Sequence, residues 1–346
     1  MIDDLAGFYG QLTPDGETLR LFNLTNSNGF EVTFMDWGAT WLSCKVPMKA
    51  GPLRETLLRS ATLQDHLAHT VYLGATVGRY ANRIKGGAFD CNGEPVVLSR
   101  NHFDNTLHGG DRGFDRHSWT GIQQDEATVV FSRRSPDGEE GFPGEIDVKV
   151  TYQVSGGTAA TELTATYEST TDKRTPINLT NHAYFNLSND QTILDHTLSL
   201  EADLWLPVDA ECIPVAGLQN VNGTLHDFRI AKIFRDSNRA AIAYDHSYLF
   251  RTGKTPVLKQ AARLSSPAGD LSLEIMTDKP AIQLYNGEHL EGLPGAGGDP
   301  MKKYAGIALE TQFLPDSPNH PDWPHESSFV EPGQTYRYQT IFRFSQ

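Results

Sequence analysis

The segment richest in side chains that can exchange protons or bind a polar ligand has the sequence NLTNHAYFNL, from Asn178 to Leu187. On a β-strand its alternation would place four polar side chains on one face: Asn178, Thr180, His182 and Tyr184. These groups form hydrogen bonds without a fixed charge, which suits a histidine that must change protonation near neutral pH. The segment predicts a ligand-facing surface. A polar sheet face packed against another loop is the structural alternative.

A second segment, YAGIALETQFLPDSPNHPDWP from Tyr304 to Pro324, offers a carboxylate with free space beside it. On a strand, Glu310 shares its face with Gly306 and Ala308, and such small neighbours leave room for a ligand. The structural alternative is a solvated glutamate on an edge strand. Because the Pro-rich, aromatic stretch that follows is rigid, it is suited to form a wall of a site.

Four further positions carry weaker signals. Arg83 beside Asn82, in GRYANRIK, offers a planar fork and an amide, which suit hydroxyl or carboxylate recognition. On residue type alone, an arginine that caps a loop is the favoured interpretation. His108, in NTLHGGDRG, precedes two glycines that let the backbone turn sharply and leave the imidazole uncovered. Asp245 and Gln283 are of types that bind vicinal hydroxyls, although each is unremarkable by itself.

Two other kinds of chemistry find no support in the spacing. No two of the twelve histidines stand at i and i+4, the spacing of a zinc-binding helix, and the candidates lie on predicted strands and loops. A G-x-S-x-G nucleophile motif is also missing from the sequence. What remains is an acid–base set of histidines, one carboxylate, an arginine and amides. We expect it to act without a metal or another cofactor.

Strands must position these residues, because alternating segments recur along the chain. Clear examples lie at 148–154, 163–167, 198–202, 271–275 and 336–344, with turn signals such as Ser155-Gly156-Gly157 between them. The best helical candidate is short, from Thr62 as N-cap to His69. The pattern predicts an all-β protein, as one large antiparallel β-sandwich domain over residues 1–346, with a closed barrel as the second choice.

The bulk composition limits the partners. The chain has 346 residues, 38% of them hydrophobic, and a formal net charge of −14 without a basic patch, which argues against nucleic acid and anionic membrane as partners. The start, MIDDLAGFYG, has no secretory-leader pattern, and no apolar run reaches the ~20 residues of a membrane span. Three scattered cysteines suggest neither a disulfide framework nor a zinc site. We therefore expect a cytoplasmic protein, either a monomer or a homodimer.

Five motifs, in this order, resemble the aldose 1-epimerase (galactose mutarotase) family: GRYANRI, LHGG, NLTNHAYFNL, DHSYLF and ALETQFLPDSPNHP. The resemblance spans the chain from MDWGAT to PGQTYRYQTIFRF and implies a β-supersandwich that interconverts the α and β anomers of free aldohexoses. It implies that His182 is the general acid and Glu310 the general base. The implied sugar-binding residues are Asn82, Arg83, His108, Tyr184, Asp245 and Gln283, the first three of them at the ring oxygen and the anomeric end.

Three other functions compete with this interpretation. A carbohydrate-binding module would not need both His182 and Glu310, and a glycoside hydrolase would need two carboxylates. A sugar-phosphate epimerase should show more cationic groups than Arg83. For the epimerase, we predict that imidazole and carboxylate stand about 5 to 8 Å apart in one open pocket, because a pyranose must fit between them. Arg83 and His108 would lie at its rim.

Overall fold

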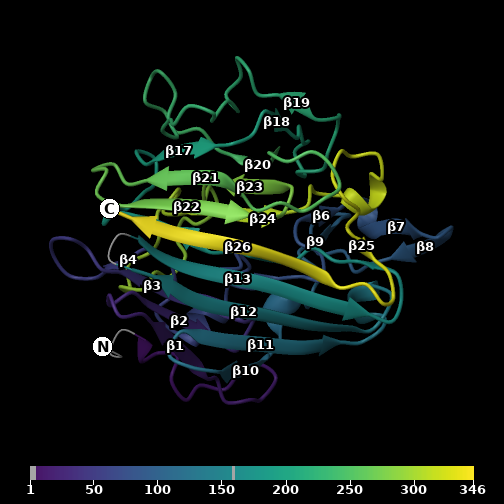
Figure 1. Cartoon of the computed structure of the whole chain (residues 1–346), viewed down its shortest axis with the longest axis horizontal. Coiled ribbons are helices and arrows are strands. Elements are labelled where there is room, and N and C mark those ends of the chain that lie inside the picture. The colour runs from purple at the N-terminus through teal and green to yellow at the C-terminus, as the bar shows by residue number, and fades with distance from the viewer. Residues whose placement is uncertain (1–4, 158–159) are drawn as a thin grey trace.

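Residues 5–157 and 160–346 are described by the computed structural model of the chain, and antiparallel strands dominate them (Figure 1). The largest sheet has eight strands and crosses Figure 1 from β10 at the bottom to β17 near the top. In spatial order they are β10 (Thr120–Gln123), β11 (Thr128–Ser135), β12 (Ile146–Gly156), β13 (Ala160–Thr171), β26 (Tyr336–Ser345), β22 (Ser272–Thr277), β21 (Lys259–Ser265) and β17 (Thr197–Leu200).

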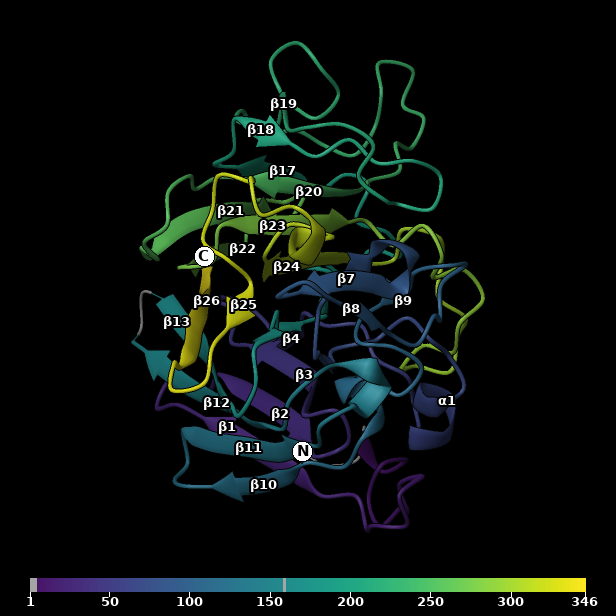
Figure 2. The ribbon, with the colours of Figure 1, turned by 90° about the vertical axis from the view of Figure 1, so that its right-hand side faces the viewer.

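Two smaller sheets form the second layer, which Figure 2 shows beside the eight-stranded sheet. One contains β1 (Leu21–Thr25), β2 (Glu31–Met35), β3 (Thr40–Val46) and β4 (Arg54–Glu55). The other has the order β16 (Tyr184–Phe185), β24 (Ile307–Gln312), β23 (Ala281–Tyr285), β20 (Asp245–Leu249), β18 (Leu204–Trp205) and β19 (Gln219–Asn220). A bridge between Leu57 and Phe185 links the two sheets.

Aromatic rings fill the space between the layers. Phe34 of β2 stacks on Tyr152 of β12 with ring centroids 4.2 Å apart. Trp41 of β3 meets Phe342 of β26 edge-on, with centroids 5.1 Å apart. All four rings are almost completely buried, so burial of apolar surface holds the sandwich together. This architecture confirms the predicted all-β sandwich. The closed barrel is wrong, because the large sheet ends at β10 on one side and at β17 on the other, and these two strands do not pair with each other.

Paired short strands and turns of helix complete the described part of the chain. The pairs are β5 (Thr76–Val77) with β15 (Thr180–Asn181), β6 (Arg83–Ile84) with β9 (Thr106–Leu107), β7 (Ala88–Cys91) with β8 (Glu94–Val97), and β14 (Thr175–Pro176) with β25 (Phe329–Val330). The 3-10 turns are η2 (Lys85–Gly87), η3 (Phe114–Arg116), η4 (Glu139–Gly141) and η5 (Ser317–Asn319). No helix among residues 5–157 and 160–346 is long and apolar enough to cross a membrane. The first four residues of the segment judged for a leader lie outside the described residues.

The helix and the strands predicted from the five alternating segments lie where the pattern places them. The helix α1 (Leu63–Leu67) begins at Thr62, whose Oγ1 accepts a hydrogen bond of 3.1 Å from the Asp65 amide. Buried and exposed residues alternate along β12, β13 and β26, as expected for strands with one face on the core. The predicted elements are therefore confirmed where one face packs on the core and the other meets solvent.

The segment 178–187 differs from its prediction. It forms two short strands, β15 and β16, rather than one, and its polar side chains are buried rather than facing an open surface. Asn178 donates to the Ala81 carbonyl oxygen (3.1 Å), and Asn181 donates to that of Gly74 (2.7 Å). The amides satisfy backbone groups of neighbouring loops, and this explains why polar residues occupy a protein interior here.

Candidate active site

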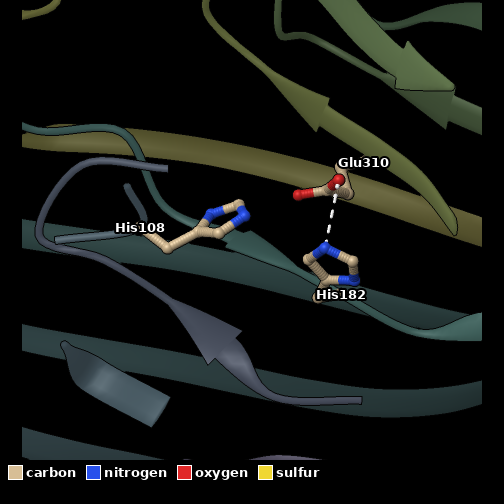
Figure 3. Close-up of side chains that lie close together, drawn as sticks. All are labelled: His108, His182 and Glu310. Atoms are coloured by element: carbon tan, nitrogen blue, oxygen red, sulfur yellow. Dashed lines mark ion pairs between the residues drawn. The ribbon is translucent and has the colours of Figure 1, made fainter. Parts of the chain in front are cut away.

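The imidazole of His182 and the carboxylate of Glu310 are in direct contact, with Nε2 and Oε1 3.4 Å apart (Figure 3). Glu310 lies within β24, and His182 lies between β15 and β16. β16 pairs antiparallel with β24, with Tyr184 opposite Ala308. Two residues further along, the same register sets His182 opposite Glu310, where directly opposed side chains approach closely. The strand pairing thus creates the acid–base pair.

This geometry corrects two expectations about the pair. The separation is shorter than the predicted 5 to 8 Å, and the side chains of His182 and Glu310 are only 6% and 2% exposed, so they do not line an open face. The prediction assumed that a sugar ring must separate the two groups, whereas cross-strand pairing brings them together. The most exposed of the predicted site residues is Asp245, whose side chain is 30% exposed, so the site opens on that side.

Burial controls the charge of this pair. It raises the pKa of the Glu310 carboxyl to about 8. The negative charge of Asp245 adds to this shift, and the positive charge of Arg83 opposes it. Burial lowers the pKa of the His182 imidazole to about 4, although the Asp245 charge acts in the other direction. Both shifts favour uncharged groups. Between these two pKa values the pair therefore holds one proton in total, which either residue can carry.

His108 lies beside the pair in a fixed tautomer. Its ring centroid is 5.3 Å from that of His182, and Figure 3 shows it directed toward the same space. Its Nδ1 accepts a hydrogen bond of 3.1 Å from the backbone amide of Asn82. Burial holds the pKa of this imidazole well below its usual range, so the ring is neutral and its one proton sits on Nε2. His108 is thus a hydrogen-bond donor toward the site.

The turn predicted at His108 exists, but it does not uncover the ring. Gly109 has a φ of +92°, and a Cβ there would lie 2.1 Å from the carbonyl oxygen of Gly78. Only glycine therefore fits this close approach of two loops. The loops pack so tightly that His108 is 6% exposed, and the expectation of an uncovered rim histidine is wrong.

Arg83, Asp245 and Gln283 form a second polar group beside the pair. Nη2 of Arg83 lies 3.4 Å from Oδ2 of Asp245, and Nε2 of Gln283 donates to Oδ1 of Asp245 at 2.5 Å. Burial raises the pKa of Asp245, but Arg83 and the hydrogen bond from Gln283 outweigh it, so the net shift is downward and the group stays ionised. Asn82 adds a carboxamide oxygen that accepts from the Arg83 amide at 2.9 Å. Ionised and amide groups in such an array suit hydroxyl recognition.

Tyr184 is placed differently from the other predicted sugar ligands. Its ring lies 5.0 Å from that of His182 and is 2% exposed, within an apolar cluster that includes Leu290 and Met301. It packs against the imidazole and helps exclude water from it. Burial raises its pKa well above the usual range, so the phenol remains protonated.

Two residues of the site were missed in the sequence. Tyr72 stacks on His182 with centroids 5.7 Å apart and meets His108 edge-on at 4.5 Å. Cys212 donates from Sγ to Oδ2 of Asp245 at 3.4 Å. Both residues have a positive φ, +57° and +59°, but neither stands in a motif of chemically suggestive residues. No signal in the residue types could have identified them.

One group within the described ranges has the ligand types of a metal site: His108, His182 and Glu310, with donor atoms within 4.8 Å of one another. Zn–N bonds of about 2.0–2.1 Å would require ligand atoms roughly 3.4 Å apart, so the group would have to contract. In addition, ligation through Nε2 of His108 would force its proton onto Nδ1, against the Asn82 amide. The set therefore fits proton transfer better than metal binding.

A largely buried acid–base pair beside an ionised carboxylate and amides, carried by a β-sandwich, suits an enzyme that moves protons on a polar ligand. The aldose 1-epimerase family profile matches residues 20–343. The chain belongs to the aldose 1-epimerase family.

Individual relatives match this chain over nearly their whole length, and their names support the same family. An aldose 1-epimerase from Haemophilus influenzae is 45% identical, with 96% of this chain and 97% of the relative covered. A human galactose mutarotase is 38% identical, with 97% of each chain covered. A solved aldose epimerase homologue from C. elegans superposes with a TM-score of 0.87 at 30% identity, covering 95% of this chain and 99% of the other.

Proposed function

We propose that this chain interconverts the α and β anomers of free aldohexoses, galactose and glucose among them. The observation that carries the proposal is the 3.4 Å contact between Nε2 of His182 and Oε1 of Glu310, a pair that holds one proton. The names of the relatives, aldose 1-epimerase and galactose mutarotase, support the same reaction. An anomer exchange needs one group that accepts a proton and one that donates it, which is what the pair provides.

Each proton has a destination in this reaction. The Glu310 carboxylate takes the proton of the anomeric hydroxyl, the C1–O5 bond breaks as C1=O1 forms, and O5 takes a proton from Nε2 of His182. The open-chain aldehyde then turns about C1–C2. Reclosure sends the O5 proton back to His182 and returns a proton from Glu310 to O1. The pair keeps one proton throughout, so no net charge accumulates in the buried site.

The neighbouring residues bind and orient the sugar. His108, which carries its proton on Nε2, and Arg83, held by Asn82, donate to the ring oxygen and the anomeric end. Asp245 and Gln283 bind hydroxyls, and Tyr184 and Tyr72 enclose the imidazole. Fixed donors of this kind lower the barrier because they are already oriented when charge develops.

Polarimetry tests the proposal directly. Freshly dissolved α-D-galactose and α-D-glucose should reach their equilibrium rotation much faster with the protein than without it, in excess chelator and without an added cofactor. A rate equal to that of the buffer would refute the function. A rate that vanished with chelator and returned with a divalent ion would refute catalysis by the acid–base pair alone.

We also propose the setting of this activity. Residues 1–346 act as one domain, as a monomer or a homodimer, in the cytoplasm. The three cysteines, Cys44, Cys91 and Cys212, are free thiols, as in most proteins of a reducing compartment.

A further inference from the structure

A tight turn in the chain contacts both the loop that carries His108 and the carboxylate of Asp245. We call residues 206–215, which follow β18, the arch. Within it, the Asp209 carboxylate accepts from the amides of Glu211 (2.9 Å) and Ile213 (3.0 Å), and the Asp209 amide donates to the Ile213 carbonyl oxygen (3.0 Å). These bonds fix the tip of the arch, so its side chains have defined positions.

Two side chains at this tip reach the site. Oε2 of Glu211 accepts a hydrogen bond of 2.9 Å from Asn105, a residue of the loop that carries His108. Sγ of Cys212 donates to Oδ2 of Asp245 at 3.4 Å. The arch thus ties the His108 loop to the strand that carries Asp245.

The Asp245 carboxylate accepts hydrogen bonds from three side chains, and the arch supplies one of them. Gln283 binds Oδ1, while Arg83 and Cys212 share Oδ2. A carboxylate has about four lone-pair positions, so one remains for a ligand hydroxyl. The direction of this free position depends on all three donors, because losing one lets the carboxylate rotate about its last side-chain torsion.

The sheet order indicates which part of a sugar Asp245 meets. β24, which carries Glu310, lies between β16 on the His182 side and β23 and β20 on the Asp245 side. C1 of the sugar has two ring neighbours, O5 and C2. With C1 at Glu310 and O5 at His182, C2 and its hydroxyl face Asp245.

We propose that Cys212 is a positioning residue that orients the Asp245 carboxylate toward the C2 hydroxyl of the bound sugar. The inference rests on the proposed function and adds a determinant of sugar affinity that acts through Asp245. Cys212 touches neither reacting oxygen, so its loss weakens binding and leaves proton transfer intact. Of the other thiols, Cys44 belongs to the hydrophobic core between the layers, and Cys91 donates to the carbonyl oxygen of Arg174.

The test compares kinetic constants for galactose in matched variants. Cys212→Ala should raise KM about three- to tenfold and leave kcat within about twofold, since one hydrogen bond to a charged group is lost. Cys212→Ser should restore KM, because a hydroxyl donates at the same place and both variants keep a side chain at the positive φ. Cys91→Ala is the matched control and should change neither constant.

A double-mutant cycle separates positioning from a general packing effect. In an Asp245→Ala background, Cys212→Ala should have no further effect, because the carboxylate it orients is gone. The Cys212→Ala effect should also vanish with 2-deoxy-D-galactose. An effect that persists without Asp245 would overturn the positioning role, and one that persists with the deoxy sugar would overturn the assignment to C2.

Equilibrium binding of galactose by calorimetry provides a readout that needs no turnover. The dissociation constant should weaken by the same factor in Cys212→Ala and recover in Cys212→Ser. An unchanged dissociation constant would overturn the inference while leaving the anomerase activity of the wild-type chain in place. If wild type binds galactose with this Cys212 dependence but does not accelerate mutarotation, the proposed function fails and the positioning of Asp245 stands.

Discussion

His182 and Glu310 can act on one substrate although they touch each other, because the two reacting oxygens are bonded to the same carbon. O1 and O5 of a hemiacetal are closer together than the 3.4 Å that separates Nε2 from Oε1. The predicted separation of about 5 to 8 Å assumed that the imidazole and the carboxylate stand on opposite sides of the whole sugar ring. Two oxygens on one carbon require a much shorter distance between the imidazole and the carboxylate. Side chains directly opposite each other on paired strands lie at such a distance.

The pair predicts a bell-shaped pH profile of kcat/KM. Below about pH 4 the pair takes up a second proton on His182, and no base remains. Above about pH 8 Glu310 loses the last proton, and no acid remains. Because kcat/KM reports groups of the free enzyme, activity should be highest between these values. Polarimetric rates from pH 3.5 to 10 would measure it, and a flat profile would contradict it.

Removing either group should abolish most of the activity. Glu310→Gln and His182→Asn keep size and polarity but cannot exchange a proton, so we expect kcat to fall by ~10² or more in each. The double variant should be little worse than either single one, because the two groups act as a unit. Circular dichroism and thermal unfolding would show that both variants fold. Near wild-type turnover in either variant would remove that residue from the mechanism.

At the scale of elements, hydrophobic alternation located the strands but not their partners. β12, β13 and β26 have one face on the core and one on solvent, and their pattern is unambiguous. The polar residues of segment 178–187 meet buried backbone instead of solvent, since Asn178 and Asn181 donate to carbonyl oxygens of distant loops. A pattern of types cannot reveal whether a polar side chain meets water or a buried carbonyl oxygen.

The same limit applies to the site. Residues within distinctive motifs, such as His182 and Glu310, could be proposed as candidates, and the structure brings them together. Tyr72 and Cys212 reach the site only because the segment before β5 and the arch return to it in three dimensions, which neighbouring residues in the sequence do not indicate.

A buried lysine, Lys279, forms a hydrogen bond with the backbone of the segment that precedes His182. Nζ of Lys279 donates to the Leu179 carbonyl oxygen, while the Leu179 amide donates to the hydroxyl of Tyr336 at 3.1 Å. The ammonium also lies 4.8 Å from the ring centroid of Tyr167. Burial lowers the pKa of Lys279 to about 7, and Asp278 opposes this shift.

This lysine predicts a stability that depends on pH. The unfolded chain binds the Lys279 proton up to its ordinary pKa of 10.5, but the folded chain releases it near 7, so the free energy of unfolding rises with pH between these values. From pH 6.5 to 9, wild type should gain about 2 kcal/mol over Lys279→Met in urea unfolding. Lys254→Met, at an exposed lysine, is the matched control for the loss of a lysine side chain. A wild-type advantage that does not change with pH would contradict the lowered pKa.

At the scale of the whole molecule, the large sheet supports the sheet that carries the site. Oγ1 of Thr311, the residue after Glu310 on β24, lies 2.6 Å from Oγ1 of Thr340 on β26. Side chains alternate along β24, so Thr311 points to the large sheet while Glu310 points to the site. The position of the carboxylate therefore depends on the packing of the two layers.

Phe342 tests how much this packing contributes. The ring is 3% exposed and touches Trp41 and Phe185, at centroid distances of 5.1 and 5.8 Å, so it joins the large sheet to both sheets of the second layer. Phe342→Ala should lower the free energy of unfolding by about 3–5 kcal/mol, because a buried ring is lost and a cavity remains. Phe103→Ala is the matched control, since that ring is 70% exposed and its loss should change stability by no more than about 0.5 kcal/mol. Urea unfolding measures both, and equal losses would contradict a sandwich held together by its interlayer aromatic core.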